Sequence, residues 1–345
     1  MKSNYLEILN SLNKDSVKPK LSIDSNVLII DAMNLFMRSF CVINHVNIHG
    51  NHIGGLTGFL KGLGSYIRMH NPTRVIIVFD GEGNSNSKKM LLNSYKDNRT
   101  DLKMIKKNLF SNKEEELTSI SNQLDHLIYY LNLLPITLLS VDKIEADDVI
   151  SYVAQHLKPK ADIVTIVSVD NDFYQLVDDK ITVYNPLLKK HFYRQQVKEK
   201  YNVYPENYLL YKTLMGDKSD NVTKIKGLGE KKIQKMFSFL QEDKKYQLED
   251  IFNHCEENKH VHDIYQKLIL YKETIKINKE VMDLQDPKIT DIDLEYIHDN
   301  LAVKPKKFDT INFKKSYHED NLNDSIKNVD MWLKDTFNQL YTFTF

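Results

Sequence analysis

The stretch NVLIID at residues 26–31 decides the fold class, because it is a continuous apolar run that closes on an aspartate. Two further runs, RVIIVFD at 74–80 and DIVTIVSVD at 162–170, repeat this form and also end on aspartate. Runs rich in Val and Ile without polar alternation are typical of strands buried on both faces of a parallel sheet. The segments between them have the apolar spacing of helices, so the sequence predicts a doubly wound α/β fold.

The charges of the chain are balanced in total but separated along the sequence. There are 47 Lys and Arg and 47 Asp and Glu in 345 residues. Lysines gather at 88–113 and 218–235, whereas acidic residues gather at 142–148. Such blocks suit a protein that grips phosphates in one place and holds metal in another, although solvated helix faces are an equal alternative for either basic block.

The two cysteines and the N-terminal stretch bear on the cellular compartment. Cys41 and Cys255 are far apart and form no disulfide framework, which favours a reducing cytosol. The N-terminal stretch has no apolar core, so it is not a signal peptide, and no apolar run is long enough to span a membrane. We therefore expect a cytoplasmic protein without membrane contact.

Acidic side chains stand where predicted strands end or helices begin. They are Asp31, Asp80, Glu145, Asp147, Asp148, Asp170, Asp172, Asp217 and Asp220. Ligands bind at the carboxyl edge of open α/β sheets, and we expect the first seven acids to converge there. So many like charges need cations, and oxygen ligands predict Mg²⁺ or Mn²⁺, a pair of which serves in-line phosphodiester cleavage. For each acid taken alone, the favoured explanation is a loop cap or a helix N-terminal residue.

Two basic elements accompany the acids. In YKDNR at 95–99, a helix would place Tyr95 and Arg99 on one face with Lys96 beside them. Lys96 and Arg99 could then clamp a scissile phosphate near the metals, and Tyr95 could stack on an unpaired base.

The second element is KIKGLGEKK at 224–232, in which a glycine turn separates two helical pieces. Gly227 and Gly229 would let backbone amides approach a phosphate at the start of the next helix. Lys226, Lys231 and Lys232 would add positive charge. We interpret the element as a sequence-independent binder of duplex backbone; an ordinary packing corner between two helices is the alternative.

The order of the motifs resembles the flap endonuclease / 5′-3′ exonuclease family over roughly residues 26–240. The motifs are DAMN at 31–34, FDG at 79–81, YKDNR at 95–99, EADD at 145–148, SVDND at 168–172, GDKSDN at 216–221 and IKGLGEKK at 225–232. The size and the divergent C-terminal half are most similar to the phage ribonuclease H branch. The hairpin motif also resembles the exonuclease domains attached to bacterial polymerases.

The resemblance implies a PIN-like, mostly parallel central sheet flanked by helices, with a helical arch, a helix–three-turn–helix and a helical C-terminal region. The expected segments are an N-terminal extension at 1–25, a nuclease core at 26–200 with its arch at about 84–125, a helix-hairpin-helix element at 201–240 and a mainly helical domain at 241–345.

The resemblance also assigns roles to residues. Asp31, Asp80, Glu145 and Asp147 or Asp148 would serve one metal ion, and Asp170, Asp172 and Asp217 the other, with Asp220 nearby. Lys96 and Arg99 would steady the phosphate, and Asp31, Asp80 and Asp170 would be the central catalytic acids. A K⁺ ion is a further expectation at the 227–229 turn.

The implied function is that of a structure-specific 5′ nuclease that removes RNA primers and 5′ flaps in DNA replication and repair. Its substrates would be branched or nicked DNA and RNA–DNA hybrid duplex, and it would act as a monomer, in the host cytoplasm if phage-encoded. A single-strand-binding protein or a sliding clamp would be a partner. The aromatic tail FNQLYTFTF at 337–345 loosely resembles a clamp-binding peptide, but packing of the terminus is the favoured interpretation.

Two alternatives from other classes stay open on the sequence alone. One is a PIN-type single-strand ribonuclease, which would be smaller and lack the hairpin motif. The other is a non-catalytic, structure-specific DNA-binding protein, which would have little use for so much negative charge beside phosphate.

Overall fold

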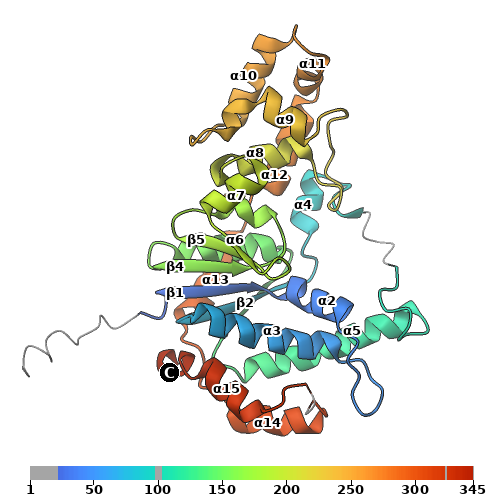
Figure 1. Ribbon diagram of the computed structural model, residues 1–345, viewed down its shortest axis with the longest axis vertical. Coiled ribbons are helices and arrows are strands. Elements are labelled where there is room, and N and C mark those ends of the chain that lie inside the picture. The colour runs from blue at the N-terminus through green and yellow to red at the C-terminus, as the bar shows by residue number, and fades with distance from the viewer. Residues whose placement is uncertain (1–21, 98–102, 323–324, 345) are drawn as a thin grey trace, which may run out of the picture.

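Figure 1 shows the computed structural model of the chain, which describes residues 22–97, 103–322 and 325–344. A six-stranded sheet in the order β3-β2-β1-β4-β5-β6 forms its centre. The strands are β1 (Asn26–Asp31), β2 (Arg74–Asp80), β3 (Thr137–Val141), β4 (Ile163–Val167), β5 (Ile181–Asn185) and β6 (Lys190–Phe192). Neighbouring strands are parallel, except that β6 runs antiparallel to β5. The predicted fold class, a mostly parallel sheet flanked by helices, is confirmed.

Helices cover the sheet and continue beyond it. Those of the sheet region are α2 (Ala32–Val42), α3 (Gly54–His70), α4 (Asn86–Leu91), α5 (Lys113–Asn132), α6 (Ala146–Leu157) and α7 (Arg194–Tyr201). Those that follow are α8 (Pro205–Met215), α9 (Glu230–Met236), α10 (Leu248–Asn258), α11 (Asp263–Leu270), α12 (Lys272–Met282), α13 (Asp291–Ala302), α14 (Thr310–Glu319) and α15 (Val329–Phe337). Short 3₁₀ turns occur at Asp172–Leu176, Ser238–Gln241 and Leu340–Phe343.

The apolar run in β1 explains why this strand lies in the middle of the sheet. Val27 and Ile29 belong to the core beneath α6, whereas Leu28 and Ile30 belong to the core beneath α2, α3 and α5. All four side chains are 0% exposed. A strand whose alternate residues enter two apolar layers needs no polar face, which is the pattern of the sequence.

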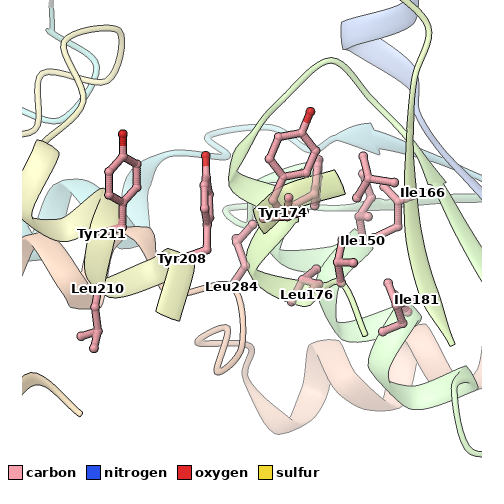
Figure 2. Close-up of a cluster of buried hydrophobic side chains, with 14 of the residues drawn as sticks. Ile150, Ile166, Tyr174, Leu176, Ile181, Tyr208, Leu210, Tyr211 and Leu284 are labelled. Carbon is pink, nitrogen blue, oxygen red and sulfur yellow. The ribbon is translucent and has the colours of Figure 1, made fainter. Parts of the chain in front are cut away.

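A row of tyrosines joins α8 to the sheet domain. Figure 2 shows Tyr174, Tyr208 and Tyr211 side by side with their hydroxyl groups pointing the same way. The ring centroids of Tyr174 and Tyr208 are 5.8 Å apart, and those of Tyr208 and Tyr211 are 6.0 Å apart. Such aromatic contacts hold α8 in a fixed position relative to the end of β4.

The last two helices lie against the sheet domain, below α3 in Figure 1. The indole of Trp332 sits so close to Gly64 of α3 that a Cβ atom would not fit there. Phe337 and Leu340 are buried. Gln339 Nε2 donates to the carbonyls of Asn71 at 3.0 Å and Pro72 at 3.3 Å. The tail therefore packs against the chain, as the favoured interpretation predicts. Phe337, Gln339 and Leu340, which would anchor a clamp-binding peptide, make contacts within the protein instead.

Three strands were not foreseen from the sequence. β3, β5 and β6 are short, and none of them forms a long apolar run ending on aspartate. Periodicity alone does not separate such short segments from loops or helix ends.

Candidate active site

Carboxylates gather at the carboxyl edge of the sheet, where β1 and β4 end side by side. Asp31 closes β1 and is 6% exposed. Its Oδ1 accepts the N–H of Asn34 at 3.1 Å, which caps α2, and its Oδ2 accepts the hydroxyl of Ser168 at 3.0 Å. Ser168 Oγ in turn accepts the N–H of Asp170 at 3.1 Å. The serine thus fixes both aspartates with respect to each other.

The start of α6 reaches the same place. Asp80 ends β2, and its Oδ1 accepts the N–H of Ala146 at 3.0 Å, which holds the first turn of α6 over the strand end. Asp147 lies in this turn. Burial raises the pKa of Asp147 well above its ordinary value, and the charges of Asp170 and Asp31 raise it further. Asp31, Asp147 and Asp170 therefore lie close enough for their charges to interact.

Glu145 is surrounded by cations and donors from the predicted arch. Lys88 Nζ and Tyr95 OH lie 2.9 and 3.0 Å from its Oε2, and Lys96 Nζ lies 2.5 Å from its Oε1. Burial alone would raise the pKa of Glu145, but Lys88 and Lys96 outweigh it and hold the pKa below the ordinary value. Lys88 Nζ is also 3.0 Å from Asp148 Oδ2, whose pKa burial raises despite the lysine.

A second lysine bridges the acids that follow β4 and α8. Lys212 Nζ lies 2.8 Å from Asp172 Oδ1 and 2.7 Å from Asp217 Oδ2. Burial and the charge of Asp170 raise the pKa of Asp172 to about 7. Burial acts the same way on Asp217, but Lys212 and Ser219 outweigh it and lower the pKa to about 2.

Asp220 is tied to the base of the predicted arch. Its carbonyl accepts the N–H of Lys96 at 3.0 Å, and its Oδ2 lies 3.4 Å from the hydroxyl of Tyr95. The GDKSDN loop and the YKDNR motif therefore meet in space, although more than a hundred residues separate them.

Three groups of acids result: Asp31 with Asp147 and Asp170, Glu145 with Asp148, and Asp172 with Asp217. In the described part of the chain, no three His, Cys, Asp or Glu side chains are already arranged to hold a metal ion. Lys88, Lys96 and Lys212 pair with several of these carboxylates instead. The donors nevertheless fit a hard divalent cation, because they are carboxylate oxygens, and burial first and neighbouring carboxylates second raise the pKa values of Asp31, Asp147 and Asp172.

The helix predicted for the YKDNR motif is not formed at its first residues, Tyr95 and Lys96. Residues 93–96 form turns, and Lys96 has a φ of 56°, in the left-handed region. Strained residues of this kind persist where surrounding contacts fix them, and here the turn lets Tyr95 and Lys96 both reach Glu145. Tyr95 is 3% exposed, so its ring has no free face for a base. Arg99 lies outside the described residues.

Three contributors were missed by sequence reasoning: Lys88, Ser168 and Lys212. Ser168 stands in the SVDND motif, two residues before Asp170, but hydroxyls next to strand ends are common. The two lysines are indistinguishable in sequence from their solvent-exposed neighbours. Only the tertiary fold shows that they are among the carboxylates.

The predicted hairpin follows α8 and ends at α9. Gly227 has a φ of +90°, which side chains other than glycine rarely adopt, and Leu228 is 0% exposed and anchors the turn. Nothing lies within 4 Å of the position that a Cβ would take on Gly227 or Gly229, so this backbone borders open space. Lys226, Lys231 and Lys232 are exposed beside it.

The raised pKa values predict how the stability of the metal-free protein depends on pH. Burial raises the pKa of Asp31, and that of Asp172, to about 7, above the value of about 3.9 in an unfolded chain. Their contribution to stability is therefore full below about pH 4 and is lost as the pH rises through 7. We expect the free energy of unfolding in EDTA to fall by on the order of 5 kcal/mol between about pH 5 and pH 8 if both groups titrate in full.

Urea melts at the two pH values measure this difference. Asp31→Asn, which cannot ionise, should reduce it, whereas Asp162→Asn at the opposite end of β4 is an exposed control. A wild-type stability that rises over the same interval would contradict the assignment of buried, mutually repelling carboxylates.

Comparison with known proteins gives the following matches. The family described as 5′-3′ exonuclease, N-terminal resolvase-like domain, matches residues 26–202, and the 5′-3′ exonuclease C-terminal SAM fold matches residues 203–309. A 5′-3′ exonuclease of Buchnera aphidicola is 30% identical over 59% of this chain and 66% of its own length, just under two thirds. One of Aquifex aeolicus is 28% identical over 88% of this chain and 94% of its own length.

A solved structure shows the same fold. The flap endonuclease of bacteriophage T5, described as a pseudo-enzyme–product complex with DNA and metal ions, has a TM-score of 0.60. It is 18% identical and covers 87% of this chain and 99% of its own.

Among the described residues, no helix is both long and apolar enough to span a bilayer.

Proposed function

This chain belongs to the 5′-3′ exonuclease family, and we propose that it is a divalent-metal-dependent, structure-specific 5′ nuclease that removes RNA primers and 5′ flaps during DNA replication and repair. The observation that carries the proposal is the group formed by the buried Asp31 and the half-buried Asp147 and Asp170, with Lys96 from the predicted arch bonded to Glu145. Acids and cations from distant motifs meet at one edge of the sheet, where phosphoryl chemistry can be supported.

We assign the metal ligands as the motif order suggests. Asp31, Asp80, Glu145 and Asp147 or Asp148 would hold one Mg²⁺ or Mn²⁺, and Asp170, Asp172 and Asp217 the other, with Asp220 adjacent. Such ions supply Lewis-acid activation of water and neutralise charge on the leaving oxygen. The T5 enzyme complex with metal ions and DNA supports this assignment by its shared fold.

The chain's own residues would orient the substrate. Lys96 pairs with Glu145, the N-cap residue of α6, and is suited to the charge that develops on the phosphate. Arg99 would assist it from the same motif. Ser168 and Asn34 keep Asp31 in place through hydrogen bonds, and the products would carry a 5′-phosphate and a 3′-hydroxyl. Contacts of this kind read charge and shape rather than base sequence.

A direct test compares end-labelled substrates in Mg²⁺. A 5′ flap, a nicked duplex, an RNA–DNA hybrid and a single-stranded RNA would be offered with free and blocked 5′ ends. We expect cleavage near the 5′ end of the branched, nicked and hybrid duplexes and little on the single strand. Preferential cleavage of the single-stranded RNA would favour the PIN-type ribonuclease instead, and the end-block would separate exonuclease from endonuclease action.

The hairpin is proposed to hold the backbone of the duplex. Its open glycine turn at Gly227 and Gly229 and the exposed Lys226, Lys231 and Lys232 support this role, and a K⁺ ion at the turn is part of the proposal. Lys231→Ala with Lys232→Ala is expected to weaken binding of all duplex sequences alike. The slope of log K against log salt should become shallower by about 1.8, since each phosphate contact contributes about 0.9.

Fluorescence anisotropy over a salt series measures that slope. Lys306→Ala with Lys307→Ala removes the same charge from an exposed segment before α14, at the far end of the molecule from α9 (Figure 1). This control should leave the slope unchanged. An unchanged slope in the hairpin variant would identify the hairpin as a mere packing corner.

The remaining expectations concern organisation and partners. The segments 1–25, 26–200, 201–240 and 241–345, the phage ribonuclease H branch, a monomeric state and contact with a single-strand-binding protein are kept as proposals. The tail does not present the anchors of a clamp-binding peptide, because Phe337 and Leu340 are buried and Gln339 is hydrogen-bonded to Asn71.

A further inference from the structure

Lys88 links the predicted arch to the acidic site. It lies on α4, and its ammonium is 2.9 Å from Glu145 Oε2 and 3.0 Å from Asp148 Oδ2. The side chain is only 12% exposed. Lys89, the next residue, is 40% exposed and makes only a loose pair with Asp97 at 3.6 Å. Of two adjacent lysines on the same short helix, one therefore enters the site and the other remains at the surface.

Apart from Lys88, α4 is held by packing against α12 and by Leu92, the residue after its end, which contacts a small apolar cluster. None of its side chains is buried. The hydroxyl of Ser87 donates to the carbonyl of Lys143 at 3.1 Å, at the exposed loop that precedes α6. Because none of the side chains of α4 is buried, its packing against α12 contributes little apolar burial, and the charge-assisted pairing of Lys88 with two carboxylates is its strongest attachment to α6.

The same pairing competes with cation binding at these two acids. Both oxygens of Glu145 are engaged, Oε2 by Lys88 and Tyr95 and Oε1 by Lys96. A divalent ion cannot approach Glu145 Oε2 and Asp148 Oδ2 while an ammonium group lies between them, because the two cations repel one another. A divalent ion with two positive charges would therefore displace the single charge of the Lys88 ammonium from Glu145 and Asp148.

We propose that Lys88 is a positioning residue that holds Glu145 and Asp148 and docks α4 on the metal-free site, and that binding of a divalent cation there releases it. The inference rests on the proposed metal-dependent function. Ion binding and docking of α4 then oppose each other, and this coupling is reciprocal. The first segment of the arch becomes free to move at the moment when the site acquires its ions, so the arch would adapt to a DNA strand only on a loaded enzyme.

The experiment uses the full-length protein without DNA, so that cleavage is not the readout. Ca²⁺ binding is measured by calorimetry on protein stripped with EDTA. Lys88→Gln, which removes the charge and keeps much of the length, is expected to bind Ca²⁺ at least about 5-fold more tightly than wild type. Lys89→Gln is the matched control and should bind as wild type does. Lys88→Arg restores the positive charge and should return the affinity toward that of wild type.

Hydrogen exchange of the backbone at residues 86–96 gives a second readout. In wild type and in Lys89→Gln, exchange is expected to be slow without Ca²⁺ and several-fold faster with it. In Lys88→Gln it should be fast in both conditions. A merely structural lysine would speed the exchange but leave the Ca²⁺ affinity unchanged or lower.

The outcomes separate the two proposals. If wild type binds Ca²⁺ and Lys88→Gln binds it no more tightly, the role of Lys88 is overturned while the metal-dependent function stands. If wild-type α4 exchanges at the same rate with and without Ca²⁺, the coupling is likewise overturned. If no variant binds a divalent ion, both the coupling and the proposed metal dependence fail.

Discussion

Asp170→Asn is expected to slow cleavage of a 5′-flap substrate by about 10³-fold or more while DNA affinity stays within a few-fold of wild type. Asp170 faces Asp147 and Asp172, and its charge is felt by both. Losing one anionic ligand would cost the transition state about 4 kcal/mol, which corresponds to about 10³ in rate. The fold should survive, because an asparagine Oδ1 can still accept the N–H of Asp172, now 2.8 Å from Asp170 Oδ1.

Single-turnover cleavage in Mg²⁺ and anisotropy binding in EDTA measure the two quantities separately. Asp162→Asn, exposed near the start of β4, is the control because it changes the same group at the opposite edge of the sheet. Cleavage by Asp170→Asn at the wild-type rate would remove the basis for a metal site between the ends of β1 and β4.

Lys96→Ala is expected to lower the single-turnover rate by about 10²- to 10³-fold with little change in the dissociation constant for DNA. The ammonium lies 2.5 Å from Glu145 Oε1 and 5.0 Å from the ring centre of Tyr95, so it is held at the start of α6 by two partners. A cation fixed in this way needs little reorganisation when negative charge develops on a phosphate. Its removal should therefore affect the rate rather than the affinity.

Lys107→Ala, an exposed lysine of the same basic segment, provides the comparison. It should leave the cleavage rate unchanged. A loss of DNA affinity equal to the loss of rate in Lys96→Ala would show that Lys96 only attracts the nucleic acid.

The sequence predicted those parts of the fold that depend on local pattern. The run at 26–31 lies in the middle of the sheet because its alternate side chains enter two apolar layers, and an unbroken apolar run is the direct signature of that position. The position of Asp31, Asp80 and Asp170 at the site was predicted because each of them closes an apolar run. The start of α6 at Ala146 was predicted from the acidic residues around it.

The remaining features depend on tertiary contacts that leave no local trace. Lys88 and Lys212 contact the acids only because the fold places α4 and α8 beside them. The left-handed φ of Lys96 reflects its contacts with Glu145 and the carbonyl of Asp220, which the pentapeptide itself does not encode. The spacing of the motif predicted a helix, and at Tyr95 and Lys96 these tertiary contacts impose a turn instead.

The contact between Trp332 and Gly64 shows that the packed core extends beyond the part of the chain that the family models match. The family match ends at residue 309, but α14 and α15 close the apolar layer over α3, and Arg68 donates from α3 to the hydroxyl of Thr336 at 2.5 Å. A chain shortened to the family boundary would keep every motif residue and still lose part of its core. The family match and the packed core therefore end at different residues: the match stops before α14, whereas α14 and α15 complete the apolar layer over α3.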